Sequence, residues 1–360
     1  MKSVLIAAAV GLIVSILVTP LAIKAFRRQG FGQEIRDDGP ESHLSKKGTP
    51  TMGGTVMVLA TVLGYLVAHL FLLSQEGRGV TKTGLLLLFL LIGMGTVGFL
   101  DDYLKIRHRR SLGLNGTAKL VGQLIVGVTF AVLALVGDDG GTAVATTAVS
   151  FVRDIEPLAL PAVLFVAVAY LFIAGFSNAV NITDGLDGLA AGCSAMVFSS
   201  YVIISFWQFG HDCGSALAAD GCYTVRDPLD VTLIAAAAMG ACLGFLWWNT
   251  SPARIFMGDT GSLALGGLIA GIAIVSRTEL LLIVLGGLFV VETLSVMLQV
   301  AVFKSTRKRL FRMAPFHHHF ELAGWAETTV LVRFWIIAGL AVAFGLGLFY
   351  AEFISYGLPG

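Results

Sequence analysis

The sequence predicts an all-α protein that crosses a membrane about ten times. Of its 360 residues, 56% are hydrophobic and only 13% are charged. A soluble domain carries about a quarter charged residues, so this composition argues against a soluble fold. Apolar stretches of about 20 residues, the length that crosses a bilayer as a helix, recur along the whole chain. Lipid offers the backbone no hydrogen-bond partners, so these stretches are expected to be helical.

Ten apolar stretches are expected to be membrane spans, and together they make residues 1–360 a single membrane domain. The first is too long for a signal peptide and is followed by Lys24, Arg27 and Arg28, so we expect it to persist as a span. The eighth is short and glycine-rich, and it is the weakest of the ten. In chain order the stretches are 4–23, 51–73, 83–100, 120–136, 158–176, 189–209, 231–248, 262–276, 280–303 and 330–350.

Lysine and arginine are distributed unevenly over the connections between these spans. Counted along the sequence, 18 of the 24 basic residues lie in the connections 24–50, 101–119, 177–188, 249–261 and 304–333. Positively charged connections stay in the cytoplasm, so this side is expected to be cytoplasmic and both termini to lie outside. The net charge is only +1, so the basic residues indicate topology and no nucleic-acid partner.

Four polar motifs fall on the face that is predicted to be cytoplasmic. GFLDDYLK carries Asp101 and Asp102, and NAVNITDGLDGL follows the fifth span. WWNTSPARIFMGDTGS contains Asp259, and RMAPFHHHFE precedes the tenth span. Taken singly, such residues are explained as helix caps and water-facing turns. Because all four motifs lie at span ends on one side, we predict that they form one active-site cleft.

The acidic residues of these motifs predict a magnesium site. Neighbouring carboxylates repel by roughly 4 kcal/mol at about 4 Å, so Asp101, Asp102 and Asp259 in one cleft require a cation. Oxygen ligands suit Mg²⁺, and the sequence has no zinc-like cysteine or histidine spacing. Three consecutive histidines cannot all point one way, so one or two of them binding phosphate or a nucleobase is favoured over a three-histidine metal site. With nearby lysines, the chemistry indicates phosphoryl transfer.

The motifs also carry a family resemblance that covers about residues 48–335. GTPTMGGT, GFLDDYLK, NAVNITDGLDGLA, MGDTGSLALGG and APFHHHFELAGW resemble the phospho-N-acetylmuramoyl-pentapeptide transferases of the polyprenyl-phosphate aminosugar-1-phosphate transferase superfamily. The resemblance implies a Mg²⁺-dependent enzyme of the bacterial plasma membrane, with ten spans and a homodimeric form. Such an enzyme transfers phospho-MurNAc-pentapeptide from UDP-MurNAc-pentapeptide to undecaprenyl phosphate within the membrane lipid, giving lipid I and UMP for peptidoglycan synthesis.

Residue roles follow from the same resemblance. It implies that Asp101, Asp102 and Asp259 are catalytic, with Asp259 and Asp102 at the metal. The implied substrate-binding residues are Lys47, Lys105, Lys119, Asn178, Asn181, Asp184, Asp187, Asn249, Phe256, His317, His318 and His319. We expect direct attack by the lipid phosphate, and a covalent aspartyl intermediate or base catalysis by Asp101 remains an alternative. Transfer of a different aminosugar phosphate is the runner-up function, and an ion-coupled transporter is the alternative from another class.

Glu292 and the four cysteines lead to structural expectations. Glu292 is costly in mid-span, so we expect it to face the protein interior or the cleft, or its helix to be broken there. Cys213 and Cys222 share one outward loop, where a disulfide and two free thiols are equally expected. The other two cysteines are expected to be small core residues.

Overall fold

The computed structural model describes residues 1–30, 32, 48–108, 113–137, 142–214 and 221–357. Ten helices in this part of the chain are long and apolar enough to cross a membrane, which confirms the predicted all-α membrane fold. They are α1 (Lys2–Arg28), α2 (Gly54–Glu76), α3 (Lys82–His108), α4 (Gly116–Leu135), α5 (Ala162–Thr183), α6 (Leu189–Gly210), α7 (Pro228–Asn249), α8 (Gly258–Val275), α10 (Gly287–Thr306) and α12 (Glu327–Gly357).

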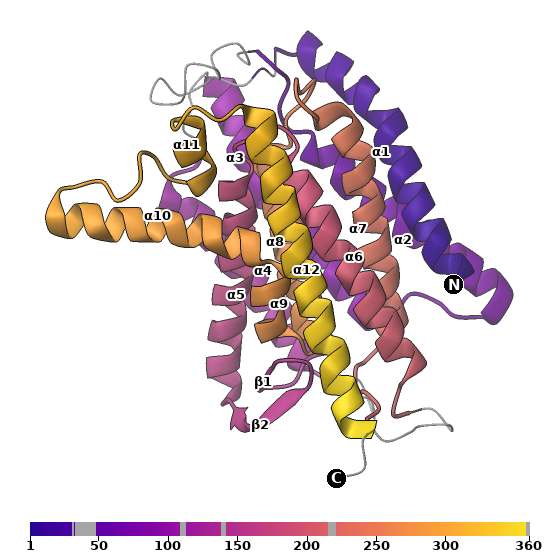
Figure 1. Ribbon diagram of the computed structural model, residues 1–360. Coiled ribbons are helices and arrows are strands. Elements are labelled where there is room, and N and C mark those ends of the chain that lie inside the picture. Colours follow the sequence, from indigo (N-terminus) through magenta and orange to yellow (C-terminus); the bar gives the residue numbers. More distant parts are fainter. Residues whose placement is uncertain (31, 33–47, 109–112, 138–141, 215–220, 358–360) are drawn as a thin grey trace.

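Helix α8, which the sequence predicts as the weakest span, is the centre of the bundle (Figure 1). Every residue from Thr260 to Val275 is buried, and α8 packs mainly against α3 and α5. Its glycines permit this contact, because a Cβ on Gly266 would lie 2.4 Å from the carbonyl oxygen of Phe176. Small residues that let backbones approach are the usual basis of helix packing in membranes. The high glycine content of this stretch therefore reflects contact with protein instead of lipid.

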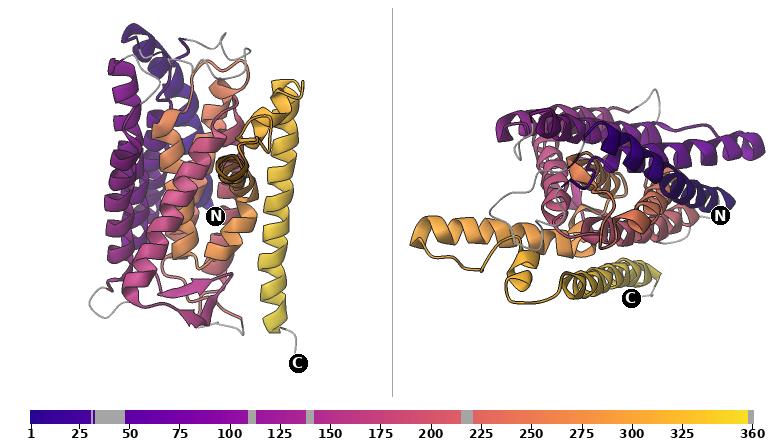
Figure 2. Two further views of the ribbon diagram at one scale, coloured as in Figure 1. Left: turned by 90° about the vertical axis from the view of Figure 1, so that its left-hand side faces the viewer. Right: turned by 90° about the horizontal axis from the view of Figure 1, so that it is seen from above.

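The ninth predicted span is divided into two helices. A short α9 (Glu279–Leu285) ends at Gly286, and α10 begins directly after it. Helix α10 lies across the bundle and leaves it sideways (Figures 1 and 2). Glu292 is fully buried near the start of α10. The expectation that Glu292 faces the protein interior is thus confirmed, whereas the alternative of a break at Glu292 itself is not, because α10 continues through this residue and the break lies at Gly286.

A short antiparallel hairpin of β1 (Ala148–Ser150) and β2 (Asp154–Ala159) lies at the end of the bundle opposite α11 (Phe316–Glu321) (Figure 1). Arg153, in the turn of this hairpin, donates hydrogen bonds to the carbonyl oxygens of Gly221 and Cys222. Its guanidinium also pairs with Glu352 of α12 at 2.7 Å and lies 4.2 Å from the centre of the Tyr223 ring. Arg153 therefore joins the hairpin, the loop after α6 and the end of α12.

The four cysteines have separate structural roles. Cys213 and Cys222 form a disulfide in the loop between α6 and α7, which settles the alternatives that the sequence leaves open. Cys193 and Cys242 are buried free thiols inside spans, as the sequence predicts. The disulfide lies beside the Arg153 contacts at the end of the bundle opposite α11 (Figure 1).

Replacing both Cys213 and Cys222 by serine is expected to lower the free energy of unfolding by about 2–3 kcal/mol, because the open loop gains conformational entropy in the unfolded chain. Thermal unfolding in detergent measures this loss. The transferase activity expected from the sequence is predicted to stay unchanged, since the bridge lies at the far end from the acidic motifs. A folded double variant without activity would contradict this separation, and wild type treated with a reductant serves as the matched comparison.

Candidate active site

The ends of four helices meet at the end of the bundle that also holds α11 (Figure 1). Helix α3 brings Asp101, Asp102 and Lys105, and the first turn of α8 brings Asp259. Residues from α4 and α5 complete the group. Motifs that lie far apart in the sequence thus converge on one end, as their placement at span ends predicts.

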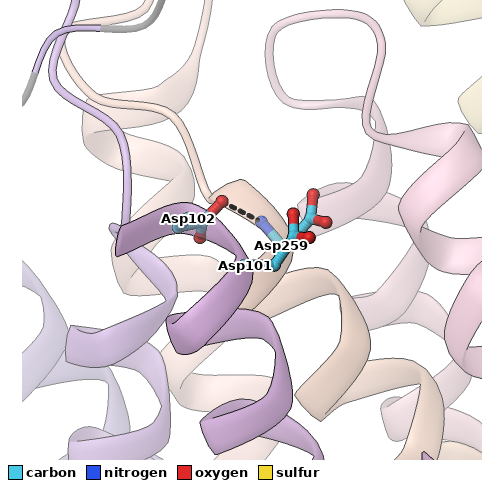
Figure 3. A group of neighbouring side chains, drawn as sticks. All are labelled: Asp101, Asp102 and Asp259. Carbon is cyan, nitrogen blue, oxygen red and sulfur yellow. Dashed lines mark hydrogen bonds between the residues drawn. The ribbon is translucent and has the colours of Figure 1, made fainter. Parts of the chain in front are cut away.

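Asp101, Asp102 and Asp259 form what we call the carboxylate cluster (Figure 3). One oxygen from each of the three lies within 4.8 Å of the others. Asp101 and Asp102 are buried, and Asp259 is half-buried. Their spacing depends on a close contact of α3 with α8, because a Cβ on Gly98 would lie 2.1 Å from the main-chain oxygen of Asp259.

Two lysines supply the positive charge that faces the cluster. Lys105 Nζ lies 2.6 Å from Asp101 Oδ2, 3.2 Å from Asp259 Oδ1 and 3.8 Å from Asp102 Oδ1. Lys119 Nζ, from the first turns of α4, lies 2.7 Å from Asp259 Oδ2. The predicted phosphate-contacting lysines Lys105 and Lys119 are therefore at the cluster itself. The third predicted lysine, Lys47, lies outside the described residues.

Asp259 is the most richly partnered of the three carboxylates. Besides the two lysines it receives a hydrogen bond of 2.8 Å from Asn181 Nδ2, which also approaches Ser262 Oγ at 2.8 Å. Ser262 donates in turn to the carbonyl oxygen of Gly258. The side-chain amide of Asn181, from α5, is thus held between Asp259 and Ser262 of α8. Sequence analysis does not identify Ser262, although its position three residues after Asp259 puts it on the same helix face.

Asp102 has a different role, because it caps α8 from a neighbouring helix. Its oxygens accept hydrogen bonds from Asp259 N at 3.1 Å, Thr260 N at 2.9 Å and Thr260 Oγ1 at 2.7 Å. Met257, the residue before α8, offers no side-chain cap. The first amides of a helix need an acceptor, and a carboxylate there is also favoured by the helix dipole. Asp102 therefore fixes the position of α8 relative to α3.

The charge balance at this end of the bundle remains negative. Asp184 follows α5 at its C-terminal end. Desolvation by the surrounding chain, and then the charges of Asp259 and Asp102, raise the pKa of Asp184 to about 8. Asp184 is therefore largely protonated at neutral pH, and the excess negative charge comes from the cluster, where two lysines face three carboxylates. Carboxylate oxygens in excess over the available positive charge fit a hard divalent cation such as Mg²⁺.

The loop 184–188 is held from several sides. Asn249 Oδ1 accepts from Gly188 N at 3.1 Å, while its Nδ2 donates to the carbonyl oxygen of Ile255 at 2.9 Å. Asp187 Oδ2 accepts from Ala253 N at 2.9 Å. The structure thus places the side chains of Asp187 and Asn249 in loop contacts, not in the carboxylate cluster. Their direct contact with substrate stays a prediction.

Glu327 adds a contact that sequence analysis does not identify. From the start of α12, its Oε1 accepts from the main-chain N–H of Asp187 at 3.3 Å. The first turn of α12 is thus tied to the loop 184–188. No motif marks this residue, because its partner is a main-chain group that any residue type would supply.

Two other predicted residues lie further from the cluster. Asn178, one helical turn before Asn181, donates to Gln123 Oε1 at 3.1 Å and to the carbonyl oxygen of Ala174 at 2.8 Å. Phe256 lies just before α8, where its N–H donates to the carbonyl oxygen of Pro50 and its carbonyl oxygen accepts from Gly53. These contacts join α4 to α5 and the start of α2 to the start of α8.

The three histidines lie in α11, and each contacts a different partner. His317 Nδ1 lies 3.1 Å from Glu292 Oε2, and His318 Nδ1 lies 2.6 Å from Glu321 Oε2. His319 Nδ1 accepts from the main-chain N–H of Arg312 at 3.1 Å. Of the three, His317 is fully buried. It is the histidine that packs against the loop 184–188, at Gly185.

Comparison with known proteins identifies relatives along the whole chain. A family model described as glycosyl transferase family 4 matches residues 84–277. The phospho-N-acetylmuramoyl-pentapeptide-transferase of Frankia casuarinae is 65% identical over 358 residues, 99% of each chain. Proteins of the same name from Saccharopolyspora erythraea and Mycobacterium leprae are 61% and 56% identical, over 99% of this chain and 98% and 99% of theirs.

The contact between α3 and α8 yields a test of the site geometry. Gly98→Ala puts a methyl group against the main chain of Asp259, where no flexible side chain can move aside. We expect a loss of about 1–3 kcal/mol in unfolding free energy from overpacking. Because the carboxylates would shift, we also expect a fall in turnover of about 100-fold. Gly175→Ala in α5 is the matched control, since nothing lies within 4 Å of its added Cβ. Equal behaviour of the two variants would refute the close-contact argument.

Proposed function

The chain belongs to the phospho-N-acetylmuramoyl-pentapeptide-transferase family, and we propose on that premise that it transfers phospho-MurNAc-pentapeptide from UDP-MurNAc-pentapeptide to undecaprenyl phosphate. The products are lipid I and UMP. The observation that carries the proposal is full-length identity of up to 65% with transferases of that name. The carboxylate cluster with Lys105 and Lys119 supports it chemically, because phosphoryl transfer depends on positioned charge around the moving group.

The carboxylate cluster is proposed to hold Mg²⁺. Asp259 and Asp102 are the proposed metal residues, with Asp101 beside them, and the three carboxylates lie close enough to share one ion. When bound, Mg²⁺ supplies neutralising charge to the phosphate oxygens. Lys105 and Lys119 now neutralise the carboxylates, and they are proposed to contact the substrate diphosphate as well. Asp102 combines its proposed metal role with the cap on α8.

The chemical step is proposed to be direct attack by the lipid phosphate. A phosphate monoester has a second pKa of about 6, so the acceptor is largely dianionic at neutral pH and needs no general base. Its oxygen forms a bond to the phosphorus attached to the sugar, and the bond from that phosphorus to UMP breaks. One phosphoanhydride replaces another, so little net driving force is required. The chain's part is to hold both phosphates in line and balance their charge.

The remaining predicted residues are proposed to bind the nucleotide and the sugar phosphate. Asn181 supports this proposal most directly, because it donates a hydrogen bond to Asp259. Asp184 supports it through its pKa, which the charges of Asp259 and Asp102 raise. The proposed set further includes Lys47, Asn178, Asp187, Asn249, Phe256, His317, His318 and His319. For Asp187 and Asn249 we propose an indirect part, in which they shape the binding loop through the contacts described above.

The protein is proposed to lie in the bacterial plasma membrane as a homodimer, with the site facing the cytoplasm and both termini outside. The excess of lysine and arginine on the connections at the site end supports this orientation. The C-terminus lies at the opposite end of the bundle from α11 (Figure 1). A cytoplasmic site would give the enzyme access to a nucleotide-linked substrate, while undecaprenyl phosphate would reach it from the membrane lipid.

Activity is tested by incubating purified protein with UDP-MurNAc-pentapeptide, undecaprenyl phosphate and Mg²⁺. UMP and lipid I are expected in equal amounts. The same protein given UDP-GlcNAc instead is expected to release no UMP. Release of UMP from UDP-GlcNAc alone would favour the related aminosugar transferases over the proposed function.

Removing the metal or its main proposed ligand is expected to stop transfer. Chelation by EDTA should abolish UMP release, and added Mg²⁺ should restore it. Asp259→Asn is expected to lose activity by more than about 100-fold while remaining folded, because it removes a proposed carboxylate ligand of the metal. Wild-type turnover by Asp259→Asn at saturating Mg²⁺ would show that this carboxylate is not a metal ligand.

Direct attack is distinguished from a covalent route by omitting the lipid acceptor. Enzyme mixed with UDP-MurNAc-pentapeptide alone is expected to give no burst of UMP, because no phospho-enzyme forms. Rapid quenching and quantification of UMP against enzyme concentration make this measurement. A burst equal to the enzyme concentration would establish a covalent intermediate instead.

A further inference from the structure

Glu292 forms a buried pair with His317 and has no part of its own in the proposed mechanism. Both side chains are 0% exposed, although one lies in a membrane helix and the other in the short α11. Glu292 Oε2 accepts a hydrogen bond of 2.9 Å from Phe316 N and lies 3.1 Å from His317 Nδ1. The single carboxylate therefore fastens the start of α11 to the start of α10.

The contacts of His317 favour one position of the imidazole hydrogen. Glu292 Oε2 already accepts from Phe316 N, and a carboxylate oxygen that accepts from both groups places the hydrogen of His317 on Nδ1. Its other nitrogen, Nε2, is buried and has no hydrogen-bond partner among the described residues. If a neutral ring carried its hydrogen on Nε2, the bare Nδ1 and Glu292 Oε2 would face each other as two acceptors. The Nε2 hydrogen would then be a buried donor without a partner among the described residues. Such an arrangement is disfavoured in a buried site.

The free edge of the imidazole lies directly against the binding loop. A Cβ on Gly185 would be 2.3 Å from His317 Nε2 and 2.9 Å from Cε1, so the ring contacts the main chain of this residue. Gly185 directly follows Asp184, whose carboxyl group interacts with the carboxylate cluster. The loop 184–188 is thus held by hydrogen bonds on its other sides and supported here by a ring.

We propose that Glu292 is a positioning residue for the transfer reaction: it fixes His317 with the hydrogen on Nδ1, and the ring so oriented holds Gly185 and hence Asp184 in place. The inference rests on the proposed function, because the loop serves catalysis only if Asp184 takes part in transfer. Glu292 itself touches no substrate in this proposal. Its burial in a broken membrane span, which is costly for a carboxylate, is explained by this positioning role.

The tautomer is measured directly by ¹⁵N NMR of protein labelled at histidine, without substrates present. His317→Asn identifies the His317 signals by their disappearance. In wild type, Nδ1 of His317 is expected to be the protonated nitrogen. Finding hydrogen on Nε2 alone would overturn the proposal, and this measurement holds whether or not the protein proves to be a transferase.

Glu292→Leu is the decisive variant. It removes the one oxygen that lies against both Phe316 N and His317 Nδ1, so the hydrogen of His317 is expected to be held on Nδ1 no longer and to distribute over both ring nitrogens. Turnover should fall about 10- to 100-fold, because the loop that carries Asp184 is displaced. Unchanged His317 signals or unchanged turnover would refute the proposal.

Control variants separate positioning from a general loss of stability. Glu321→Gln alters the equivalent glutamate–histidine contact at His318 and is expected to leave the His317 signals in place. Glu292→Asp keeps the carboxylate and should retain the Nδ1 hydrogen, with more turnover than Glu292→Leu. Gly185→Ala should lower turnover without changing any ionisable group, because its methyl group displaces the ring. If Glu292→Leu does not fold, a Gly185→Ala protein with wild-type turnover refutes the proposal.

Discussion

The electrostatic balance between three carboxylates and two lysines is the interaction on which the rest of the site depends. Asp101, Asp102 and Asp259 would repel one another strongly if nothing separated their charges. Lys105 and Lys119 supply that separation, and each comes from a different helix end. The lysines therefore meet the carboxylates only when α3, α4 and α8 are packed in their observed positions. An ion or a phosphate that enters the site must replace some of the ion pairs that hold these helices together.

Hydrogen bonds between side chains and main-chain groups fix the positions of the segments around the ion pairs. The cap that Asp102 places on α8, and the contacts of Asn249 and Glu327 with the loop 184–188, all use backbone atoms. A backbone partner fixes position without depending on the neighbouring side chain. Several polar residues of the motifs thus hold the backbone around the carboxylate cluster and its two lysines. Such supports are what a site made from helix ends requires, because helix ends leave unpaired amides and carbonyls.

Composition and spacing predicted the ten spans and the meeting of Asp101, Asp102 and Asp259, because hydrophobicity fixes the spans and their parity fixes which ends share a face. The break at Gly286 was not predicted, since the apolar run continues through it and tertiary contacts decide the direction of α10. The partners of His317 and Asn249 lie in distant segments, so no local pattern reveals them. The sequence also left the disulfide undecided, because the presence of two cysteines in one loop does not show whether the loop brings them together.

The burial of α8 from Thr260 to Val275 has a consequence for how the protein is made. A span rich in glycine and alanine is stabilised by close contact with other helices and not by contact with lipid. Its principal neighbours, α2, α3 and α5, all precede it in the chain. When α8 leaves the ribosome, the surfaces that it needs have therefore already been synthesised. The order of synthesis thus lets a helix that is enclosed by protein become the axis of the assembled enzyme.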